Sequence, residues 1–290
     1  MSDLFDFERE PDEYAVMGNP ITHSKSPLIH TAFAEQTRQS IRYRAIQVDP
    51  GGFDQAVGNF FAVGGKGLNI TVPFKQEAWK LANSLSERAR LAGAVNTLKP
   101  DDEGKLFGDN TDGIGLVRDL KNNLGVTIAD KKILLLGAGG AARGVLSPLV
   151  DEHPAQIVIA NRTASRAHEL AQQFNAQRKN VGLLTGAGFN ELGDMQFDIV
   201  INATSASLAG DLPPIPADCL ANAAIVYDMM YGKNPTPFLV WAKQQGAEQI
   251  SDGLGMLVEQ AAESFFIWRN VKPETQSVIK SIRDKLSAEN

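Results

Sequence analysis

The sequence predicts an α/β protein built from two largely parallel sheets. Short β-branched runs alternate with helical patterns along most of the chain, which is typical of βαβ units with helices on both faces of a sheet. The length of 290 residues corresponds to about two domains at roughly 150 residues each. A turn-rich GDNTDG segment leads into a helical pattern near Asp109–Gly115, so we place the boundary between the two sheets there.

Each predicted strand is a short apolar or β-branched run bounded by glycine, proline or small polar residues. The predicted strands are, in order, Tyr14–Met17, Ile41–Val48, Gly67–Val72, Ala94–Leu98, Lys132–Leu136, Gln156–Ala160, Gly182–Leu184, Asp198–Asn202, Ile225–Asp228 and Gln249–Ser251. Apolar side chains that recur three and four residues apart predict the helices between them. The predicted helices include Pro27–Gln36, Asp112–Asn122, Ala141–Leu149, Arg166–Phe174 and Pro237–Gln245. After Ser251 the chain is helical to its end, and a pair of helices there could return to cover the first domain.

Composition and charge exclude several classes of protein. Hydrophobic residues make up 43% and charged residues 21% of the chain, a balance that favours a globular fold over long disorder. The net charge of -6 provides no general attraction for nucleic acid or anionic lipid, so we expect neither partner. No stretch approaches the roughly 20 apolar residues of a membrane span. Any anionic ligand must therefore be bound by a local group of residues.

Cysteine and histidine usage argues against metal sites and disulfides. The single Cys219 excludes an internal disulfide and fits a reducing compartment, so we expect a cytoplasmic protein. The four histidines show no familiar ligand spacing, and we expect no metal. The first fourteen residues carry six acids and one arginine, unlike a signal peptide, and we expect them to form a loose leader.

A glycine-rich loop predicts a Rossmann-type, doubly wound dinucleotide-binding domain. The strand Lys132–Leu136 is followed at once by Gly137, Ala138, Gly139, Gly140, Ala141 and a helical run. Glycines in this G-x-G-x-x-A arrangement permit a tight turn and close approach of the backbone, while the helix N-terminus attracts a pyrophosphate. Such turns also serve plain strand-to-helix packing, but here both flanks have the context that binding requires.

The end of the next predicted strand favours NADP(H) over NAD(H). An NAD site usually has an acidic residue there, whereas this chain has Asn161, Arg162, Thr163 and, four residues after the first arginine, Arg166. Two guanidinium groups on one turn could bind the 2′-phosphate of NADP. The alternative is a pair of solvated surface arginines, but arginine at a helix start opposes the helix dipole.

Two segments of the first domain carry candidate substrate-binding groups. Ser24, Lys25 and Ser26 precede a predicted helix, where Ser26 could be the N-cap or the three could together bind a carboxylate. In the strand Gly67–Val72, alternation directs Leu68, Ile70 and Val72 to the core and leaves Asn69 and Thr71 on the opposite face.

Lys75 follows this strand, and Asp112 begins a later helical pattern. A solvated lysine is one interpretation; a partly desolvated lysine at a helix N-terminus would give up its proton readily and suit proton transfer. Asp112 could simply cap its helix, or its carboxylate could pair with the lysine.

Several separate motifs, taken together, resemble the shikimate/quinate dehydrogenase family. They are GNPITHSKSP, GGKGLNITVPFK, LAGAVNTL, GDNTDG, GAGGAAR, NRTASR, INATS, YDMMY and DGLGMLVEQAA, and they run from about Tyr14 to the C-terminal helices. The resemblance implies a substrate-binding and catalytic domain of residues 1–112 plus 253–290, with an NADP-binding domain of residues 113–252. The segment Ser205–Ala209 carries nothing that can be assigned.

The resemblance also implies residue roles. Lys75 would be the catalytic acid/base, paired with Asp112. The substrate carboxylate would be bound by Ser24 and Ser26, and its ring hydroxyls by Asn69, Thr71, Asn96, Asp112 and Gln260. Tyr231 would contact the substrate, while Met229 and Gly253 would lie beside the nicotinamide.

The function expected from this resemblance is the NADPH-dependent, reversible reduction of 3-dehydroshikimate to shikimate, an oxidoreductase activity on a CH–OH group in aromatic amino-acid biosynthesis. One alternative is a quinate/shikimate dehydrogenase of wider specificity. Another is a non-catalytic NADP-binding sensor, which would not need to place Lys75, Asp112 and Asn96 at converging strand ends. Small molecules are the expected partners, and the chain is expected to be a monomer or a homodimer.

Overall fold

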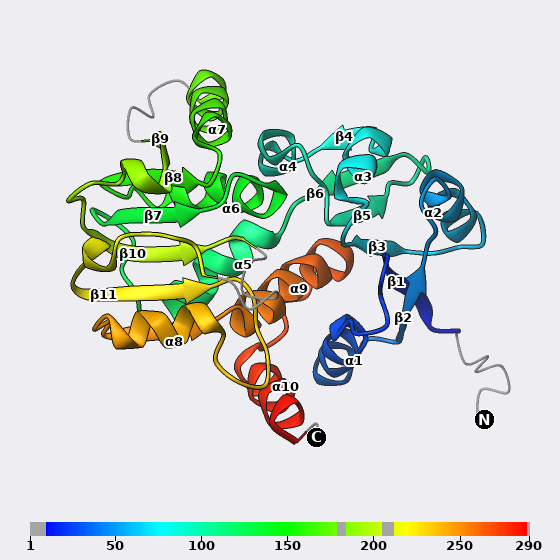
Figure 1. Ribbon diagram of the computed structural model, residues 1–290. Coiled ribbons are helices and arrows are strands. Elements are labelled where there is room, and N and C mark those ends of the chain that lie inside the picture. Colours follow the sequence, from blue (N-terminus) through cyan, green and yellow to red (C-terminus); the bar gives the residue numbers. More distant parts are fainter. Residues whose placement is uncertain (1–9, 179–183, 205–211, 289–290) are drawn as a thin grey trace, which may run out of the picture.

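A computed structural model describes residues 10–178, 184–204 and 212–288. It contains two six-stranded sheets, here called sheet A and sheet B, with helices on their faces. The two sheets form separate halves of the molecule that are joined through α5 and α9, and α9 and α10 lie beside α1 (Figure 1). The expected α/β architecture is therefore confirmed.

Sheet A is mixed, not parallel throughout. Its strands have the order β2-β1-β3-β5-β6-β4 and span Asp12–Gly18 (β1), Ile41–Gln47 (β2), Gly67–Ile70 (β3), Ser84–Leu85 (β4), Thr97–Pro100 (β5) and Leu106–Asp109 (β6). Strand β1 is parallel to β2 and β3, but β5 runs antiparallel to both β3 and β6. The prediction of a largely parallel sheet is wrong here, because β5 and β6 form a hairpin across the short connection 101–105.

Four helices accompany sheet A: α1 (Ser26–Thr37), α2 (Phe53–Ala62), α3 (Lys75–Leu81) and α4 (Glu87–Ala92). One core includes Met17, Leu68 and Leu98 from the strands together with Phe53 and Phe74, whose rings stack with centroids 5.0 Å apart. Burial of these apolar side chains fixes α2 and α3 on one face of the sheet. The core thus fixes the position of α3, which begins at Lys75.

Sheet B is entirely parallel and has the strand order β12-β11-β10-β7-β8-β9, which is that of a Rossmann domain. The strands are Lys132–Leu136 (β7), Gln156–Asn161 (β8), Leu184–Gly188 (β9), Phe197–Asn202 (β10), Leu220–Asp228 (β11) and Gln249–Asp252 (β12). Its helices are α6 (Gly140–Asp151), α7 (Ala164–Gln177) and α8 (Pro237–Gln244), and short 3₁₀ turns occupy Phe189–Glu191 and Ala217–Cys219. Alternate residues of β7 enter two different cores, Leu135 on one face and Leu134 on the other.

The helices near the junction explain how the two sheets are held together. Helix α5 (Asp112–Arg118) continues into a π-helix (Asp119–Asn123), and α9 (Leu254–Arg269) and α10 (Gln276–Ala288) follow β12. A Cβ atom on Gly115 would lie 2.7 Å from the Met256 carbonyl oxygen, and one on Gly113 would lie 2.7 Å from the Gly144 carbonyl oxygen. Glycine therefore lets α5 approach both α9 and α6 closely.

The C-terminal helices return to the first half of the molecule, as expected. Ile29 and Phe33 of α1 share a core with Phe265 of α9 and Ile282 of α10. The five predicted helices are also present. Three of them match within about two residues at each end, and α7 is longer than expected. The helix expected over Asp112–Asn122 is α-helical only to Arg118 and continues as the π-helix to Asn123.

Several local predictions are wrong. The strand expected over Gly67–Val72 ends at Ile70, because Phe74 N–H donates to the Thr71 carbonyl and closes a turn; Val72 is consequently 63% exposed rather than in the core. The strand expected over Ala94–Leu98 is instead β5, Thr97–Pro100. Strand β1 begins at Asp12, so the end of the expected leader is part of sheet A; its first nine residues lie outside the described ranges.

Two further predictions include residues that the structure does not describe. Of the strand predicted over Gly182–Leu184, only Leu184 is described, and β9 continues from there to Gly188. The unassigned segment Ser205–Ala209 lies outside the described residues.

Candidate active site

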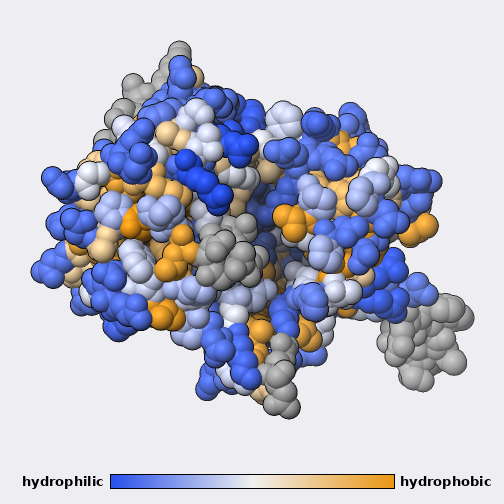
Figure 2. Space-filling model, in the orientation of Figure 1, coloured by the Kyte–Doolittle hydropathy of each residue, from blue (hydrophilic) through white to orange (hydrophobic). Residues whose placement is uncertain are grey.

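A cavity of about 340 Å³ lies where the ends of β1 and β3 face α5, α9 and the loop after β11. Its volume falls in the range of small-molecule sites. The space-filling view shows the surface hollowed between the two halves of the molecule (Figure 2). Eleven of the predicted residues line this cavity: Ser24, Ser26, Asn69, Thr71, Lys75, Asn96, Asp112, Met229, Tyr231, Gly253 and Gln260.

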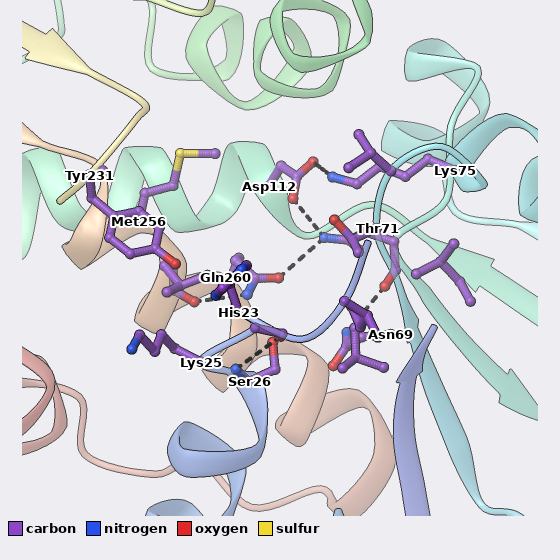
Figure 3. A pocket seen from close by; sticks show the side chains of 18 of the residues that line it. His23, Lys25, Ser26, Asn69, Thr71, Lys75, Asp112, Tyr231, Met256 and Gln260 are labelled. Carbon is purple, nitrogen blue, oxygen red and sulfur yellow. Dashed lines mark hydrogen bonds and ion pairs between the residues drawn. The ribbon is translucent and has the colours of Figure 1, made fainter. Parts of the chain in front are cut away.

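Lys75 and Asp112 form an ion pair at the edge of the cavity. Lys75 Nζ lies 2.5 Å from Asp112 Oδ2, and the two side chains are 29% and 12% exposed (Figure 3). Lys75 is the first residue of α3 and Asp112 is the first residue of α5, so two helix starts bring the charges together. The N-cap of α5 is Thr111, so the interpretation of Asp112 as a simple helix cap is wrong.

Asn96 fixes the other oxygen of the Asp112 carboxylate. Its Nδ2 donates to Asp112 Oδ1 over 2.8 Å, while its Oδ1 accepts from the Thr111 backbone N–H over 2.9 Å. Gln260 Oε1 lies 3.3 Å from the same Nδ2, across the cavity on α9. Both carboxylate oxygens of Asp112 thus have donors, which holds the carboxylate in one orientation toward Lys75.

Asn69 is held by a buried polar network behind the cavity. Its Oδ1 accepts from the Tyr43 hydroxyl over 2.7 Å, and its Nδ2 donates to Ser264 Oγ and to the Asn96 carbonyl oxygen over 3.0 and 3.1 Å. Burial of Tyr43 raises the pKa of its hydroxyl well above the usual value, so the hydroxyl stays protonated and donates to Asn69. The amide of Asn69 is therefore fixed before any ligand binds.

The start of α1 brings Ser24 and Ser26 to the cavity. The predicted capping arrangement is wrong: Lys25 is the N-cap, and Ser24 Oγ accepts from the Ser26 N–H over 3.3 Å. Ser26 is thus the first helical residue and is buried, and Pro27 follows it in the first turn. Two hydroxyls and a helix N-terminus face one end of the cavity, a combination that suits an anionic group.

The opposite wall comes from sheet B. Met229 and Tyr231 follow β11, and Gly253 follows β12. A Cβ atom on Gly253 would lie 2.2 Å from the Met229 carbonyl oxygen, so only glycine lets these two segments pack together. Burial, with a smaller effect of the Asp252 charge, raises the pKa of the Tyr231 hydroxyl and keeps it a hydrogen-bond donor.

Some residues that line the cavity were not predicted from the sequence, although the motifs contained signals for them. His23 lies in the same turn as Ser24, and Met256 and Leu257 also face the cavity. Met256 is four residues before Gln260 on α9, and residues four apart share one face of a helix. Gln260 therefore already indicated that Met256 lines the cavity.

The glycine-rich loop fits a dinucleotide. Gly137 has a φ of +106°, which favours glycine, and a Cβ there would lie 3.2 Å from Thr204 Cγ2. By contrast, Cβ atoms on Gly139 and Gly140 would have no described heavy atom within 4 Å, so this side of the loop is open. Helix α6 begins at Gly140 without a side-chain cap, which leaves its first N–H groups free to bind a phosphate.

The predicted NADP-selecting residues lie at the end of β8. Asn161 Nδ2 donates to the Thr163 carbonyl oxygen over 3.0 Å, which shapes the turn before α7. Arg162 and Arg166 are exposed, and neither guanidinium has an ion-pair partner within the described ranges. Two arginines without a carboxylate partner at this position are suited to a bound phosphate.

The described part of the chain contains neither a metal-binding cluster nor a membrane-spanning helix. No group of three or more His, Cys, Asp or Glu side chains there could hold a metal ion. No described helix is both long enough and apolar enough to cross a membrane.

The fold and these neighbouring sites define a two-domain α/β oxidoreductase that uses a dinucleotide. Family models match three parts of the chain: the shikimate dehydrogenase substrate binding domain over residues 16–98, shikimate / quinate 5-dehydrogenase over 119–209, and the shikimate 5'-dehydrogenase C-terminal domain over 253–283. The chain belongs to the shikimate dehydrogenase family.

Relatives and solved structures resemble the chain over nearly its full length. The shikimate dehydrogenase (NADP(+)) of Cellvibrio japonicus is 57% identical over 95% of this chain and 98% of its own. The crystal structure of an Ael1 enzyme from Pseudomonas putida has a TM-score of 0.88 at 48% identity, covering 96% of this chain and 99% of the other. Shikimate 5-dehydrogenase from Thermus thermophilus, in complex with NADP(H) and shikimate, has a TM-score of 0.83 at 29% identity, covering 95% of this chain and 100% of the other.

Proposed function

We propose that this chain catalyses the reversible, NADPH-dependent reduction of 3-dehydroshikimate to shikimate, a step of aromatic amino-acid biosynthesis. The observation that carries the proposal is the cavity in which the Lys75–Asp112 pair faces the sheet B wall, next to an open glycine-rich loop. Relatives that are 57% identical over nearly the whole chain bear the name shikimate dehydrogenase (NADP(+)).

Lys75 is the proposed acid/base. Bound NADPH supplies the hydride that reduces the C3 carbonyl carbon. Lys75 Nζ donates a proton to the carbonyl oxygen as negative charge develops there, and accepts it back in the oxidation direction. Asp112 holds Lys75 at 2.5 Å and is itself held by Asn96, so the ammonium group keeps its position during the transfer.

The substrate is held at its two ends. Ser24 and Ser26 would bind its carboxylate, supported by their place at the start of α1. Ring hydroxyls would be bound by Asn69, Thr71, Asn96, Asp112 and Gln260, with Tyr231 as a further contact; all six line the cavity. The Asn69 side chain already makes four hydrogen bonds within the protein, three from Nδ2 and one to Oδ1. It therefore offers the substrate a rigid surface with one remaining acceptor site.

The cofactor would lie along the open edge of sheet B. The backbone of Gly137, Ala138, Gly139, Gly140 and Ala141 would bind the pyrophosphate. The adenosine 2′-phosphate would be bound by Asn161, Arg162, Thr163 and Arg166, and the nicotinamide would lie beside Met229 and Gly253.

This function also implies an organisation and a setting. We propose that residues 1–112 and 253–290 form the substrate-binding domain and residues 113–252 the NADP-binding domain, since sheet A ends at Asp109 and sheet B spans Lys132–Asp252. A cytoplasmic monomer or weak homodimer is the proposed state, and sedimentation of the purified chain would measure its mass.

The decisive experiment measures NADPH formation by absorbance with NADP⁺ and shikimate, quinate or no substrate. Turnover of shikimate alone supports the proposal, whereas turnover of both acids supports a quinate/shikimate dehydrogenase of wider specificity, which the name of the matched family also covers. Tight NADPH binding without turnover of either acid would overturn the proposal in favour of a non-catalytic sensor.

A further inference from the structure

Arg283, on the C-terminal helix α10, contacts two segments of the cavity wall that comes from sheet B. Its Nη1 donates to the Gly232 carbonyl oxygen over 2.9 Å, and its Nη2 lies 2.5 Å from Asp252 Oδ1. Gly232 adjoins Tyr231, and Asp252 adjoins Gly253; both Tyr231 and Gly253 line the cavity. One guanidinium group therefore joins the loop after β11 to the end of β12.

The same two segments also contact each other directly. Gly253 N–H donates to the Met230 carbonyl oxygen over 3.1 Å, and Asp252 Oδ1 also accepts from the Leu254 N–H at the start of α9. Asp252 is only 10% exposed, whereas Arg283 is 38% exposed and reaches its two acceptors from outside the wall. Arg283 thus adds a side-chain link between two segments that backbone hydrogen bonds already hold together.

The helix that carries Arg283 is anchored on the other half of the molecule. Its neighbour Ile282 is buried in a core with Ile29 and Phe33 of α1, the helix whose start presents Ser24 and Ser26. Helix α10 therefore connects the two sides of the cavity: Ile282 packs against α1, which carries the proposed carboxylate site, and Arg283 binds the sheet B wall. In Figure 1, α10 lies beside both α9 and the end of the loop that follows β11.

We propose that Arg283 is a positioning residue for the reaction: by binding Gly232 and Asp252 together, it sets the distance between the sheet B wall and the substrate held on α1. This inference rests on the proposed function. Lysine cannot replace arginine fully, because one ammonium group cannot make the forked contact that reaches a carbonyl and a carboxylate at once. Charge alone is therefore not sufficient.

The test compares Arg283→Met and Arg283→Lys with Lys285→Met, a substitution of an exposed lysine on the same helix. Because a small displacement of a reacting group lowers the rate steeply, we expect Arg283→Met to lower kcat by about tenfold or more. The carboxylate site on α1 is untouched, so KM for shikimate should change by less than about threefold. Arg283→Lys should recover part of the loss, and Lys285→Met should behave as the wild type.

A second variant separates positioning from loss of stability. Asp252→Asn removes the ion pair but keeps an oxygen that can accept from Leu254 N–H. If Arg283 acts through Asp252 and Gly232, the two substitutions disturb the same contact and their effects should not add. The kcat of the double variant Arg283→Met/Asp252→Asn should therefore lie within about twofold of the kcat of the slower single variant. Additive losses, or a loss of activity that follows only the fall in melting temperature, would overturn the inference.

Hydrogen–deuterium exchange gives a result that is independent of turnover. In Arg283→Met, exchange should accelerate in residues 229–232 and 253–257, while β11 and β12 themselves stay as protected as in the wild type. Unchanged exchange in both segments would contradict the inference even if the wild type proved inactive on shikimate. An inactive wild type would contradict only the proposed function.

Discussion

Replacing Asp112 with asparagine tests the proposed catalytic pair with the smallest change in shape. The carboxylate accepts hydrogen bonds on both oxygens, from Lys75 Nζ at 2.5 Å and from Asn96 Nδ2 at 2.8 Å. An asparagine side chain has one acceptor oxygen and one donor NH₂ group. In either orientation its NH₂ therefore faces a donor, and the interaction with Lys75 or with Asn96 is lost.

The expected loss follows from these contacts. One charge-assisted hydrogen bond contributes about 1.5–3 kcal/mol, which corresponds to about 10–150-fold in rate when the bond is needed in the transition state. Lys75→Ala removes the proton donor itself and should lower kcat by about 10²–10⁴-fold. Asp112→Asn should therefore be slower than the wild type but no slower than Lys75→Ala.

The assay is the initial rate of NADPH formation from shikimate, together with the NADP⁺ dissociation constant. Asp151→Asn is the matched control, because its carboxylate also pairs with a cation, Arg178 at 2.7 Å, but is 56% exposed and does not line the cavity. NADP⁺ binding should be unchanged in both variants. A kcat for Asp112→Asn within twofold of the wild type would refute the assigned role of the pair.

Three further predictions concern the cofactor site and the buried core. Replacing both Arg162 and Arg166 with alanine should weaken NADP⁺ binding by about 10–100-fold and NAD⁺ binding by less than about threefold, since only NADP⁺ carries the 2′-phosphate; calorimetric titration measures both. Gly139→Ala should leave the melting temperature nearly unchanged, because the new methyl group meets no described atom within 4 Å, yet it should weaken NADP⁺ binding by about tenfold or more. His30 is fully buried, and burial lowers its pKa from about 6.5 in the unfolded chain to about 3 in the folded protein. Between these two pH values the unfolded chain binds more protons than the folded protein, so protonation favours unfolding. The free energy of unfolding should consequently fall with decreasing pH, and His30→Phe should remove about 1.4 kcal/mol per pH unit of that slope between about pH 6 and 4 in urea titrations.

Each of these predictions has a clear contrary outcome. Equal losses for the two dinucleotides would show that the arginines do not recognise the 2′-phosphate. Unchanged NADP⁺ affinity in Gly139→Ala would place the pyrophosphate elsewhere. For His30, the control is His168→Gln, an exposed histidine, and identical pH slopes in wild type and His30→Phe would contradict the assigned origin of the effect.

Local sequence pattern was sufficient to predict the dinucleotide-binding part of sheet B but not the strands of sheet A. In β7 a run of apolar residues is buried on both faces, and the glycines after it require a turn, so strand, loop and helix could be predicted from adjacent residues. Sheet A contains the short strands β4 and β6 and an antiparallel β5, whose partners are chosen by pairing with distant segments. Val72 continued the alternating pattern but lies in a turn, because a hydrogen bond between Thr71 and Phe74 decides the course of the chain there.

The sequence by itself determined the α/β class, the dinucleotide loop, the absence of a carboxylate after β8 and, through its motifs, eleven of the residues that line the cavity. Only the tertiary structure decided which of these residues interact. Lys75 and Asp112 are 37 positions apart and meet because two helix starts converge at one sheet edge. Arg283 bears no local signature, since its role depends on the carbonyl of Gly232 and the carboxylate of Asp252, which long-range packing alone brings within reach. Sequence patterns predict the local structure of each segment, whereas contacts between distant segments are fixed by burial of the shared core.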